Sequence, residues 1–446
     1  MPAFRYILLL LFFLSSCRDK KTAEGATEPP KIPGADLQVE LTRTAISKTQ
    51  TPQDILPYDD ALAWHEYTVD KVLYGKMASN KIRVAHWTVV AAKAIPVSEK
   101  IGEKLVLSLK AYEKFKDLDD VAKSDDLDFI DDPPRFLDIT QKLDIEQAPE
   151  ALRYDYRGNY SEQMQLYWLL RDQLKLVVMG HSHAAKGIDA SLFFAPENLT
   201  TPTALNMAAS GSNTTLQCLI TRDYLVDLPR LKKFVWVVSP RTFNAKRVDL
   251  RKETEFTNSA GYKYDLAHKA ELWPVPTAKK SVTLDDIQKQ LLLRAATPWG
   301  WENRSHTRFP EGDEQVLHTF LKKELSRLNF DWDEPAFQLF KSTVESLTAK
   351  GVEVYILFIP IHPYVVECAA TDPDGTTREG YRETVRRLEN LDADLPLVHF
   401  QDFNKEGHHD FTSDDFYDAD HVYGKGAVKL TNKVTEWMAA TEKEKP

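Results

Sequence analysis

Ser182 and a distant histidine are the residues whose types and spacing suit nucleophilic chemistry. Ser182 lies in Gly180-His181-Ser182-His183, between the apolar run 174–179 and an expected helix. Near the C-terminus, Asp418 precedes His421 by three residues. A carboxylate at this spacing can orient one ring nitrogen of a histidine while the other takes a proton from serine, whatever the chain order. Ser182, His421 and Asp418 are therefore candidates for a nucleophile, a base and an orienting group.

Each of these residues also has a purely structural interpretation. Serine is a favoured helix N-cap. Asp420 in the same C-terminal loop could cap a helix or bind a cation, and His421 could be a structural hydrogen-bonding group. The hypothesis of catalysis therefore depends on the two motifs occurring together.

The elements that must position these side chains alternate between strands and helices from residue 151 onward. Apolar runs at 174–179, 204–208, 234–238, 352–359 and 397–400 read as strands, and 163–172, 184–194 and 214–228 read as helices. Continuous apolar strands between helices indicate a parallel sheet covered on both faces, with ligands at the carboxyl ends of its strands. An insertion at about 241–350 has a helical second half and an aromatic loop, whose Trp299 and Trp301 either stack on a sugar or anchor the loop.

The region 51–150 has a β-rich pattern. Its strand candidates are 67–73, 82–90 and 105–109, with 75–80 as a hairpin turn and the acidic stretch 117–134 as a surface loop. We expect a small β-barrel or sandwich that binds glycan or docks a partner. Its aromatic and histidine side chains either pack in the core or line a sugar-binding face: Trp64, His65, Tyr67, His86 and Trp87.

The N-terminus has the pattern of a secretory signal. Arg5 precedes an apolar run at 6–14, which is too short for the ~20 residues of a spanning helix. Leu14-Ser15-Ser16-Cys17 resembles the lipobox of bacterial lipoproteins, which implies a lipid on Cys17. The alternative is an ordinary signal peptide with an incidental cysteine. We assign 1–17 to the signal and lipidated cysteine and 18–50 to a tether. Arg18 mildly favours the outer membrane among extracytoplasmic, membrane-anchored locations.

Composition excludes several classes of protein. Of 446 residues, 43% are hydrophobic and 28% charged, which is ordinary for a folded protein. The net charge of −10 argues against a dedicated nucleic-acid binder. Three cysteines cannot form a disulfide framework, and Cys218 and Cys368 either pair or are two buried thiols. His408-His409-Asp410 lacks a third ligand at a recognisable spacing, so we expect no metal and no cofactor.

Together, Gly180-x-Ser182 and Asp418-x-x-His421 resemble the SGNH/GDSL hydrolase-like superfamily. The resemblance covers about 154–437 and includes 206–212, where the family has a second block with an oxyanion glycine. It implies an α/β fold with a flavodoxin-like, three-layer parallel sheet, here beside a small N-terminal β-rich domain. It also implies Ser182, His421 and Asp418 as catalytic residues, with the amides of Ser182 and Gly211 as oxyanion donors.

The sequence departs from that family at two places. His181 stands where the esterase motif has aspartate, and the third block, Gly-x-Asn-Asp, is absent after 234–238. The side-chain oxyanion donor is therefore open among Asn213, Arg241 and Asn244. The histidine-containing first block and the long insertion resemble a divergent branch involved in polysaccharide O-acetylation. Three further histidines are candidates to line the substrate pocket: His181, His183 and His362.

The sequence thus predicts a lipid-anchored, extracytoplasmic Ser-His-Asp acyl-transfer enzyme. It would O-acetylate or deacetylate a cell-envelope or exported polysaccharide. Its partners would be an acyl donor, the polysaccharide and, by the resemblance, a membrane-bound O-acyltransferase. The alternatives are a general secreted carbohydrate or lipid esterase, and a non-catalytic envelope-binding lipoprotein with a decayed site.

Overall fold

The described chain begins close to the first β-strand. The computed structural model describes residues 34–443, with gaps at 56–57, 59, 91–92, 116–117, 119–120, 128–132, 142–152, 157–159, 195–199, 248–250, 275–280, 292, 294–295, 303–329, 364 and 366–376. Cys17 and Cys368 lie outside the described residues, so the lipidation and pairing predictions fall outside them too. Cys218 is a buried free thiol.

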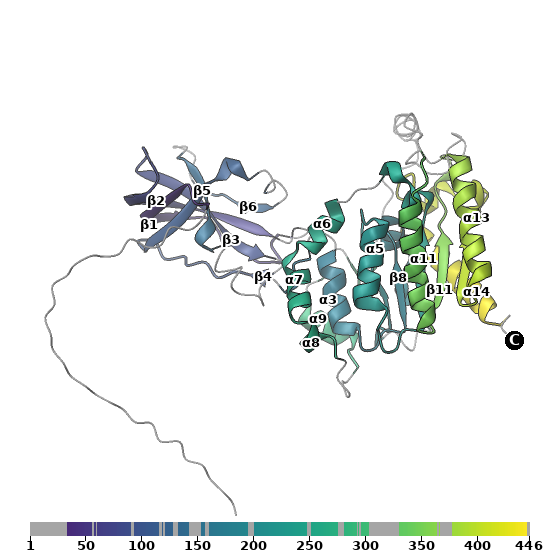
Figure 1. Ribbon diagram of the computed structural model, residues 1–446. Coiled ribbons are helices and arrows are strands. Elements are labelled where there is room, and N and C mark those ends of the chain that lie inside the picture. The colour runs from purple at the N-terminus through teal and green to yellow at the C-terminus, as the bar shows by residue number, and fades with distance from the viewer. Residues whose placement is uncertain are drawn as a thin grey trace, which may run out of the picture.

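The N-terminal unit is a closed five-stranded β-barrel (Figure 1). Strand β1 (Leu37–Ile46) pairs with β2 (Ala61–Tyr74) and β5 (Lys104–Ala111). Strand β3 (Lys81–Val90) pairs with β2 and β7 (Arg135–Asp138), and β5 pairs with β7, which closes the ring. Two short strands pair with members of this ring: β4 (Lys93–Ala94) with β3 and β6 (Ala122–Ser124) with β2.

Strand β1 corrects the predicted tether. Residues Leu37–Ile46 belong to the barrel, so the assignment of 18–50 to a tether is wrong over this range. Their apolar side chains alternate, as Leu37, Val39 and Leu41, and all three are buried. Alternation of this kind is the period of a half-buried strand. The predicted hairpin turn does separate β2 from β3.

Alternate residues of β2 and β3 form two cores. Tyr67, Ile82 and Val84 pack inside the barrel with apolar side chains of β1 and β5. Leu62 and Trp64 lie in a second cluster with Leu118 and Leu127, from the segment after β5. His65, Tyr67 and His86 are also buried. The core interpretation therefore holds for Trp64, His65, Tyr67 and His86, while Trp87 is partly buried.

The second unit contains a five-stranded, fully parallel sheet. Its strands are β8 (Leu176–Met179), β9 (Ala204–Asn206), β10 (Lys233–Val238), β11 (Glu353–Phe358) and β12 (Val398–Asp402). They lie in the order β12-β11-β10-β8-β9, with parallel neighbours throughout. The prediction of a mixed α/β unit is confirmed, and each strand lies on one of the predicted apolar runs.

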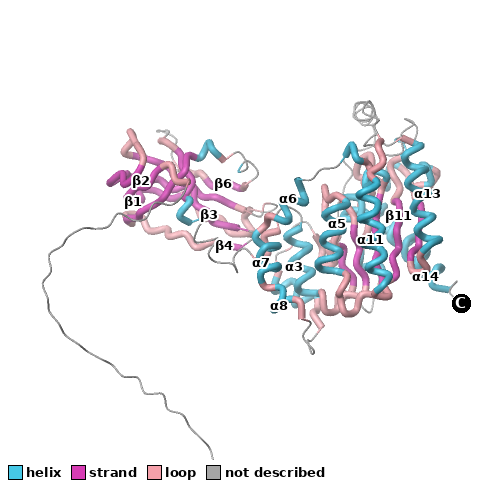
Figure 2. Tube along the Cα trace, in the orientation of Figure 1, coloured by secondary structure: helices cyan, strands magenta, loops and turns pink. Residues whose placement is uncertain are grey.

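Helices pack on both faces of this sheet (Figure 2). One face carries α3 (Tyr160–Leu170), α5 (Thr214–Ile220), α11 (Glu334–Ala349) and α13 (Arg378–Asp394) over Trp236 and Ile356. The other carries α4 (Ser182–Gly187) and α14 (Gly424–Lys443) over Val235 and Leu357. The expected helix 184–194 is shorter than predicted, because α4 ends at Gly187 and a separate 3₁₀ turn spans Ala190–Phe193.

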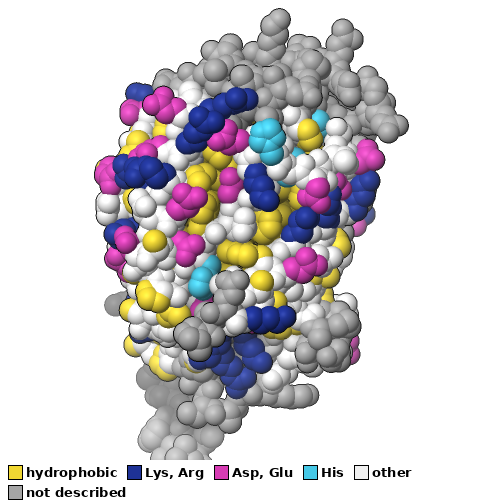
Figure 3. Space-filling view, turned by 90° about the vertical axis from the view of Figure 1, so that its right-hand side faces the viewer, with side chains coloured by type: hydrophobic (Ala, Val, Ile, Leu, Met, Phe, Trp, Pro, Cys, Tyr) yellow, Lys and Arg dark blue, Asp and Glu magenta, His cyan; other side chains and the backbone are white. Residues whose placement is uncertain are grey.

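The insertion contains helices in its first half as well as its second. The helices of the first half are α6 (Arg251–Thr257), α7 (Ala260–Ala267), α8 (Lys269–Leu272) and α9 (Leu284–Gln290). Trp301 is buried and its indole N–H donates to the Lys186 carbonyl at 2.8 Å, so this side chain anchors the aromatic loop. Basic and acidic side chains are interspersed on the face shown in Figure 3. In the part of the chain that the structure describes, no helix is long and apolar enough to cross a membrane.

Candidate active site

The position of Ser182 is fixed by a tight passage from β8 into α4. Gly180 follows the strand with φ +151°, and a Cβ there would lie 2.7 Å from the Val237 carbonyl oxygen and 2.8 Å from Ala184 Cβ. Only glycine fits this close approach. His181 is the extended N-cap of α4, and Ser182 is its first residue. The serine therefore lies at the carboxyl edge of the sheet, where ligands bind in such folds.

The loop before α14 brings His421 to this serine. His421 Nε2 lies 2.7 Å from Ser182 Oγ, and His421 Nδ1 lies 2.7 Å from Asp418 Oδ1. Asp418 Oδ1 also accepts the backbone N–H groups of His421 at 2.9 Å and Asp420 at 3.2 Å. The structure thus joins the three predicted side chains in one hydrogen-bonded chain. The Asp418 carboxylate both shapes the turn and orients the imidazole.

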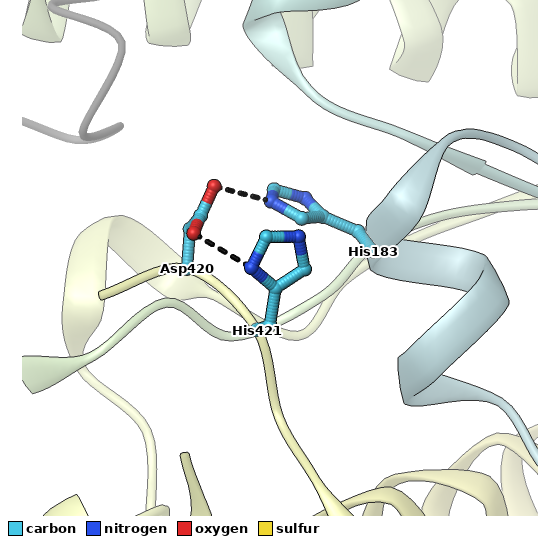
Figure 4. Close-up of side chains that lie close together, drawn as sticks. All are labelled: His183, Asp420 and His421. Atoms are coloured by element: carbon cyan, nitrogen blue, oxygen red, sulfur yellow. Dashed lines mark hydrogen bonds and ion pairs between the residues drawn. The ribbon is translucent and has the colours of Figure 1, made fainter. Parts of the chain in front are cut away.

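A second carboxylate and a second imidazole belong to the same cluster (Figure 4). Asp420 Oδ1 lies 2.9 Å from His421 Nδ1, and Asp420 Oδ2 lies 3.1 Å from His183 Nε2. The rings of His183 and His421 meet edge to face, with centroids 5.1 Å apart. Sequence reasoning considered both residues but did not connect them. The alternation in Asp418-x-Asp420-His421 was the only available signal.

The charges around His421 favour its protonated form. Burial alone would lower the pKa of His421, but the charge of Asp420 and the hydrogen bond with Asp418 outweigh it and raise the pKa to about 9. Burial opposes ionisation of Asp420, yet the neighbouring His421 and His183 hold the pKa of that carboxyl well below its usual range. Burial also holds the pKa of His181 well below its usual range, so this ring is neutral.

A polar pocket lies beside Ser182 and brings the oxyanion candidates together. Its lining includes His181, Ser182, Gly211, Asn213 and Arg241. The Ser212 hydroxyl donates to the Gly180 carbonyl at 3.0 Å, which ties the loop after β9 to the serine loop. Gly211, at φ +79°, is exposed next to it.

The two asparagine candidates both have structural tasks. Asn213 Oδ1 accepts the Leu216 N–H at 2.8 Å and so caps α5. Asn244 also lines the pocket, and its Oδ1 accepts the N–H groups of Lys246 and Asp331, each at 3.1 Å. In both residues the side-chain oxygen accepts hydrogen bonds from the backbone.

The three candidate substrate-lining histidines have different positions. His181 lines the pocket beside Ser182, and its Nε2 lies 3.3 Å from Ser239 Oγ. The other two are not among the lining residues described there. His183 faces Asp420 and borders a smaller hollow that Ser239 also lines. The rings of His362 and Phe416 meet edge to face, with centroids 5.4 Å apart. The rings of His183 and His362 thus turn toward the C-terminal loop, and their predicted contact with substrate stays a prediction.

Among the described residues, one group has ligand atoms close enough for a metal ion: His183, Asp420 and His421, within 4.8 Å of one another. Their facing atoms already form hydrogen bonds or ion pairs, and a protonated imidazole cannot coordinate a metal. His409 is occupied too, since its Nε2 lies 2.9 Å from the Ile361 carbonyl oxygen and its Nδ1 accepts the Phe411 N–H at 3.3 Å. The arrangement suits proton transfer better than metal binding.

Comparison with known proteins yields remote similarity in structure alone. No family model matches the sequence, and no curated protein matches it. A solved structure from Streptococcus pneumoniae, provisionally described as a platelet activating factor, aligns over 66% of this chain and 98% of its own, at 9% identity and a TM-score of 0.33. A structure from Bacteroides fragilis, provisionally described as an acylhydrolase, aligns over 63% and 94%, at 11% identity and a TM-score of 0.32.

Proposed function

We propose that this chain is an acyl-transfer enzyme of the SGNH type, with Ser182 as its nucleophile. The observation that carries the proposal is the contact of His421 Nε2 with Ser182 Oγ at 2.7 Å, while His421 Nδ1 contacts the Asp418 carboxylate on the opposite side of the ring. The sheet order also supports it. Numbered along the chain, the parallel strands lie in the order 2-1-3-4-5, which is flavodoxin-like, and Ser182 follows the first of them.

The mechanism uses the chain's own groups. His421, once deprotonated, takes the proton of Ser182 as Oγ attacks an ester carbonyl. The backbone N–H groups of Ser182 and Gly211 receive the developing oxyanion. The leaving alkoxide takes the proton from His421, which leaves an acyl-serine. A sugar hydroxyl or water then attacks that ester, gives its proton to His421, and the proton returns to Ser182.

The pocket supports a short acyl group and a hydroxylated substrate. Apart from Gly211 and Ala336, its lining is polar or charged: His181, Ser182, Ser212, Asn213, Thr214, Thr215, Gln217, Arg241, Thr242, Asn244 and Asp333. The pocket is also small, with a volume of about 70 Å³, so a long fatty acyl chain does not fit inside it. An acetyl ester of a polysaccharide fits this chemistry.

The proposed setting is the cell envelope. Cys17 would carry a lipid after removal of the signal, and the barrel would bind glycan or dock a membrane-bound O-acyltransferase. The N-terminal pattern of a short apolar run followed by Ser15-Ser16-Cys17 supports the anchor. A general secreted esterase of the same fold remains the alternative, and it differs in needing no partner and no sugar acceptor.

The deciding experiment is a search for an acetyl-enzyme. The chain from Arg18 onward is mixed with an activated acetyl ester, and the parent and Ser182→Ala are compared by intact mass. We expect a gain of one acetyl group in the parent alone, with the modified peptide containing Ser182. A folded parent that acquires no acetyl group would contradict the proposal and favour a non-catalytic binding protein.

A further inference from the structure

The carboxylate of Asp420 lies between two imidazoles (Figure 4). Its Oδ1 is 2.9 Å from His421 Nδ1, and its Oδ2 is 3.1 Å from His183 Nε2. The His183 side chain is 4% exposed and that of Asp420 19%. A carboxylate withdrawn from water to this extent needs charged or hydrogen-bonding partners, and these two rings supply them.

Asp418 and Asp420 differ in what they hold. Asp418 accepts the N–H groups of Asp420 and His421, so its position is fixed by the turn itself. In the described part of the chain, the Asp420 carboxylate faces imidazoles, so its position depends on His183. Because His183 comes from α4 and Asp420 from the loop before α14, their contact also joins the two segments that bear Ser182 and His421.

We propose, on the basis of the proposed function, that Asp420 is a second positioning residue for His421 and that His183 holds it in place. The imidazole then works against two carboxylates rather than the single one of a simple Ser-His-Asp chain. The second negative charge stabilises the imidazolium form, both before reaction and in the transition state.

The second carboxylate makes His421 a stronger base but leaves less of it deprotonated at neutral pH. Among the described residues, the groups that face His421 are Ser182, Asp418, Asp420 and His183. His181 lies next to His183, and the positive charge of Arg241 is close enough to lower the pKa of His181. With two carboxylates present, His421 stays protonated at neutral pH and becomes a base only as pH rises toward about 9. Loss of the Asp420 charge lowers the pKa of His421, so the rate rises at lower pH but reaches a lower plateau.

The test is the pH dependence of kcat/KM for hydrolysis of an activated acetyl ester, from pH 5 to 10.5. The variants are Asp420→Asn, His183→Phe, which fills the space without a ring nitrogen, and His183→Gln, whose side-chain N–H group can reach where His183 Nε2 lies. We expect Asp420→Asn and His183→Phe to move the midpoint of the rising limb down by about one pH unit or more and to lower the plateau ~10-fold. His183→Gln should restore the parent's profile.

A second readout separates this inference from the proposed function. Titration of the His421 ring is followed by NMR in Ser182→Ala, with and without Asp420→Asn, which requires no turnover. A downward shift of its midpoint on loss of the Asp420 charge supports the inference even if no acetyl-enzyme forms. An unchanged midpoint in folded protein, or equal profiles for His183→Phe and His183→Gln, would overturn it.

Discussion

The hydroxyl, imidazole and carboxylates around Ser182 show which parts of the site a sequence can reveal. Ser182 and Asp418-x-x-His421 were predictable, because each motif is local and its residue types limit the chemistry. The contact between His183 and Asp420 spans 237 residues and depends on where two loops meet, so no local pattern contains it. The directions of the His183 and His362 rings could not be predicted for the same reason, since ring direction follows from packing.

Asn213 is the candidate oxyanion donor whose two tasks can be separated by substitution. Its Oδ1 caps α5, and the residue also lines the pocket beside Ser182. Asn213→Asp keeps an oxygen for the cap but removes the N–H donor, whereas Asn213→Ala removes both. We expect Asn213→Asp to retain the parent's stability and lose ~10²-fold in the acylation rate, and Asn213→Ala to lose ~1 kcal/mol of stability as well.

The measurements are urea unfolding and the rate of acetyl-enzyme formation. If Asn213→Asp acylates as fast as the parent, the side chain is only a helix cap, and Arg241 or Asn244 becomes the better candidate for the missing third block.

At the scale of elements, the sequence predicts strands well where both of their faces are buried. β8, β10 and β11 are short runs of apolar residues, because helices cover the sheet on both sides. β1 was missed because polar and charged residues alternate with its buried ones, and the preceding Lys, Glu and Pro suggested a tether. A strand that is buried on one face has half the apolar signal, and its partners β2 and β5 lie far along the chain.

The junction between β8 and α4 supports a prediction about stability and activity together. Gly180→Ala would place a methyl group against the Val237 carbonyl and Ala184 at a positive φ. We expect a loss of ~3 kcal/mol in the free energy of unfolding, from overpacking and backbone strain, and a large loss of acylation because Ser182 moves. Gly351→Ala is the matched control, since it shares a positive φ of +76° but has nothing within 4 Å of the added Cβ.

The control should cost ~1 kcal/mol and leave acylation unchanged. Urea unfolding and acetyl-enzyme formation measure both effects. A Gly180→Ala variant that matches Gly351→Ala in both would show that the junction tolerates a side chain.

For the whole molecule, the barrel and the α/β unit have separate hydrophobic cores. Five-stranded barrels that bind oligosaccharides commonly use the outer face of their second and third strands. On this barrel that face carries Trp64 and Ala85, and Leu118 and Leu127 from the chain itself lie over it. A glycan or partner that binds the barrel is therefore expected at another surface, such as the loops at its ends.

The barrel core also makes one unit of the molecule sensitive to acid. His65 is fully buried, and its two ring nitrogens have no hydrogen-bond partner among the described residues. The His86 ring centroid lies 4.9 Å away, with Arg43 and Tyr67 nearby. Burial, together with the nearby His86 and Arg43, lowers the pKa of His65 to about 3. In the unfolded chain a histidine takes up a proton below about pH 6.5. The stability that the neutral ring provides is thus complete above pH 6.5 and is lost as pH falls toward 3.

We expect the His65 contribution to fall by roughly 1.4 kcal/mol per pH unit below pH 6.5. His65→Leu, which retains an apolar side chain in this core, should remove that slope. Thermal unfolding of the chain from Arg18 onward at pH 6.5, 5.5 and 4.5 measures this slope. The difference between parent and variant separates the contribution of His65 from those of the other titrating groups. Because the two cores are separate, the substitution should raise the unfolding temperature of the barrel at acid pH and leave that of the α/β unit unchanged. Equal pH dependence in parent and variant would mean that His65 reaches water or a partner as the barrel takes up protons.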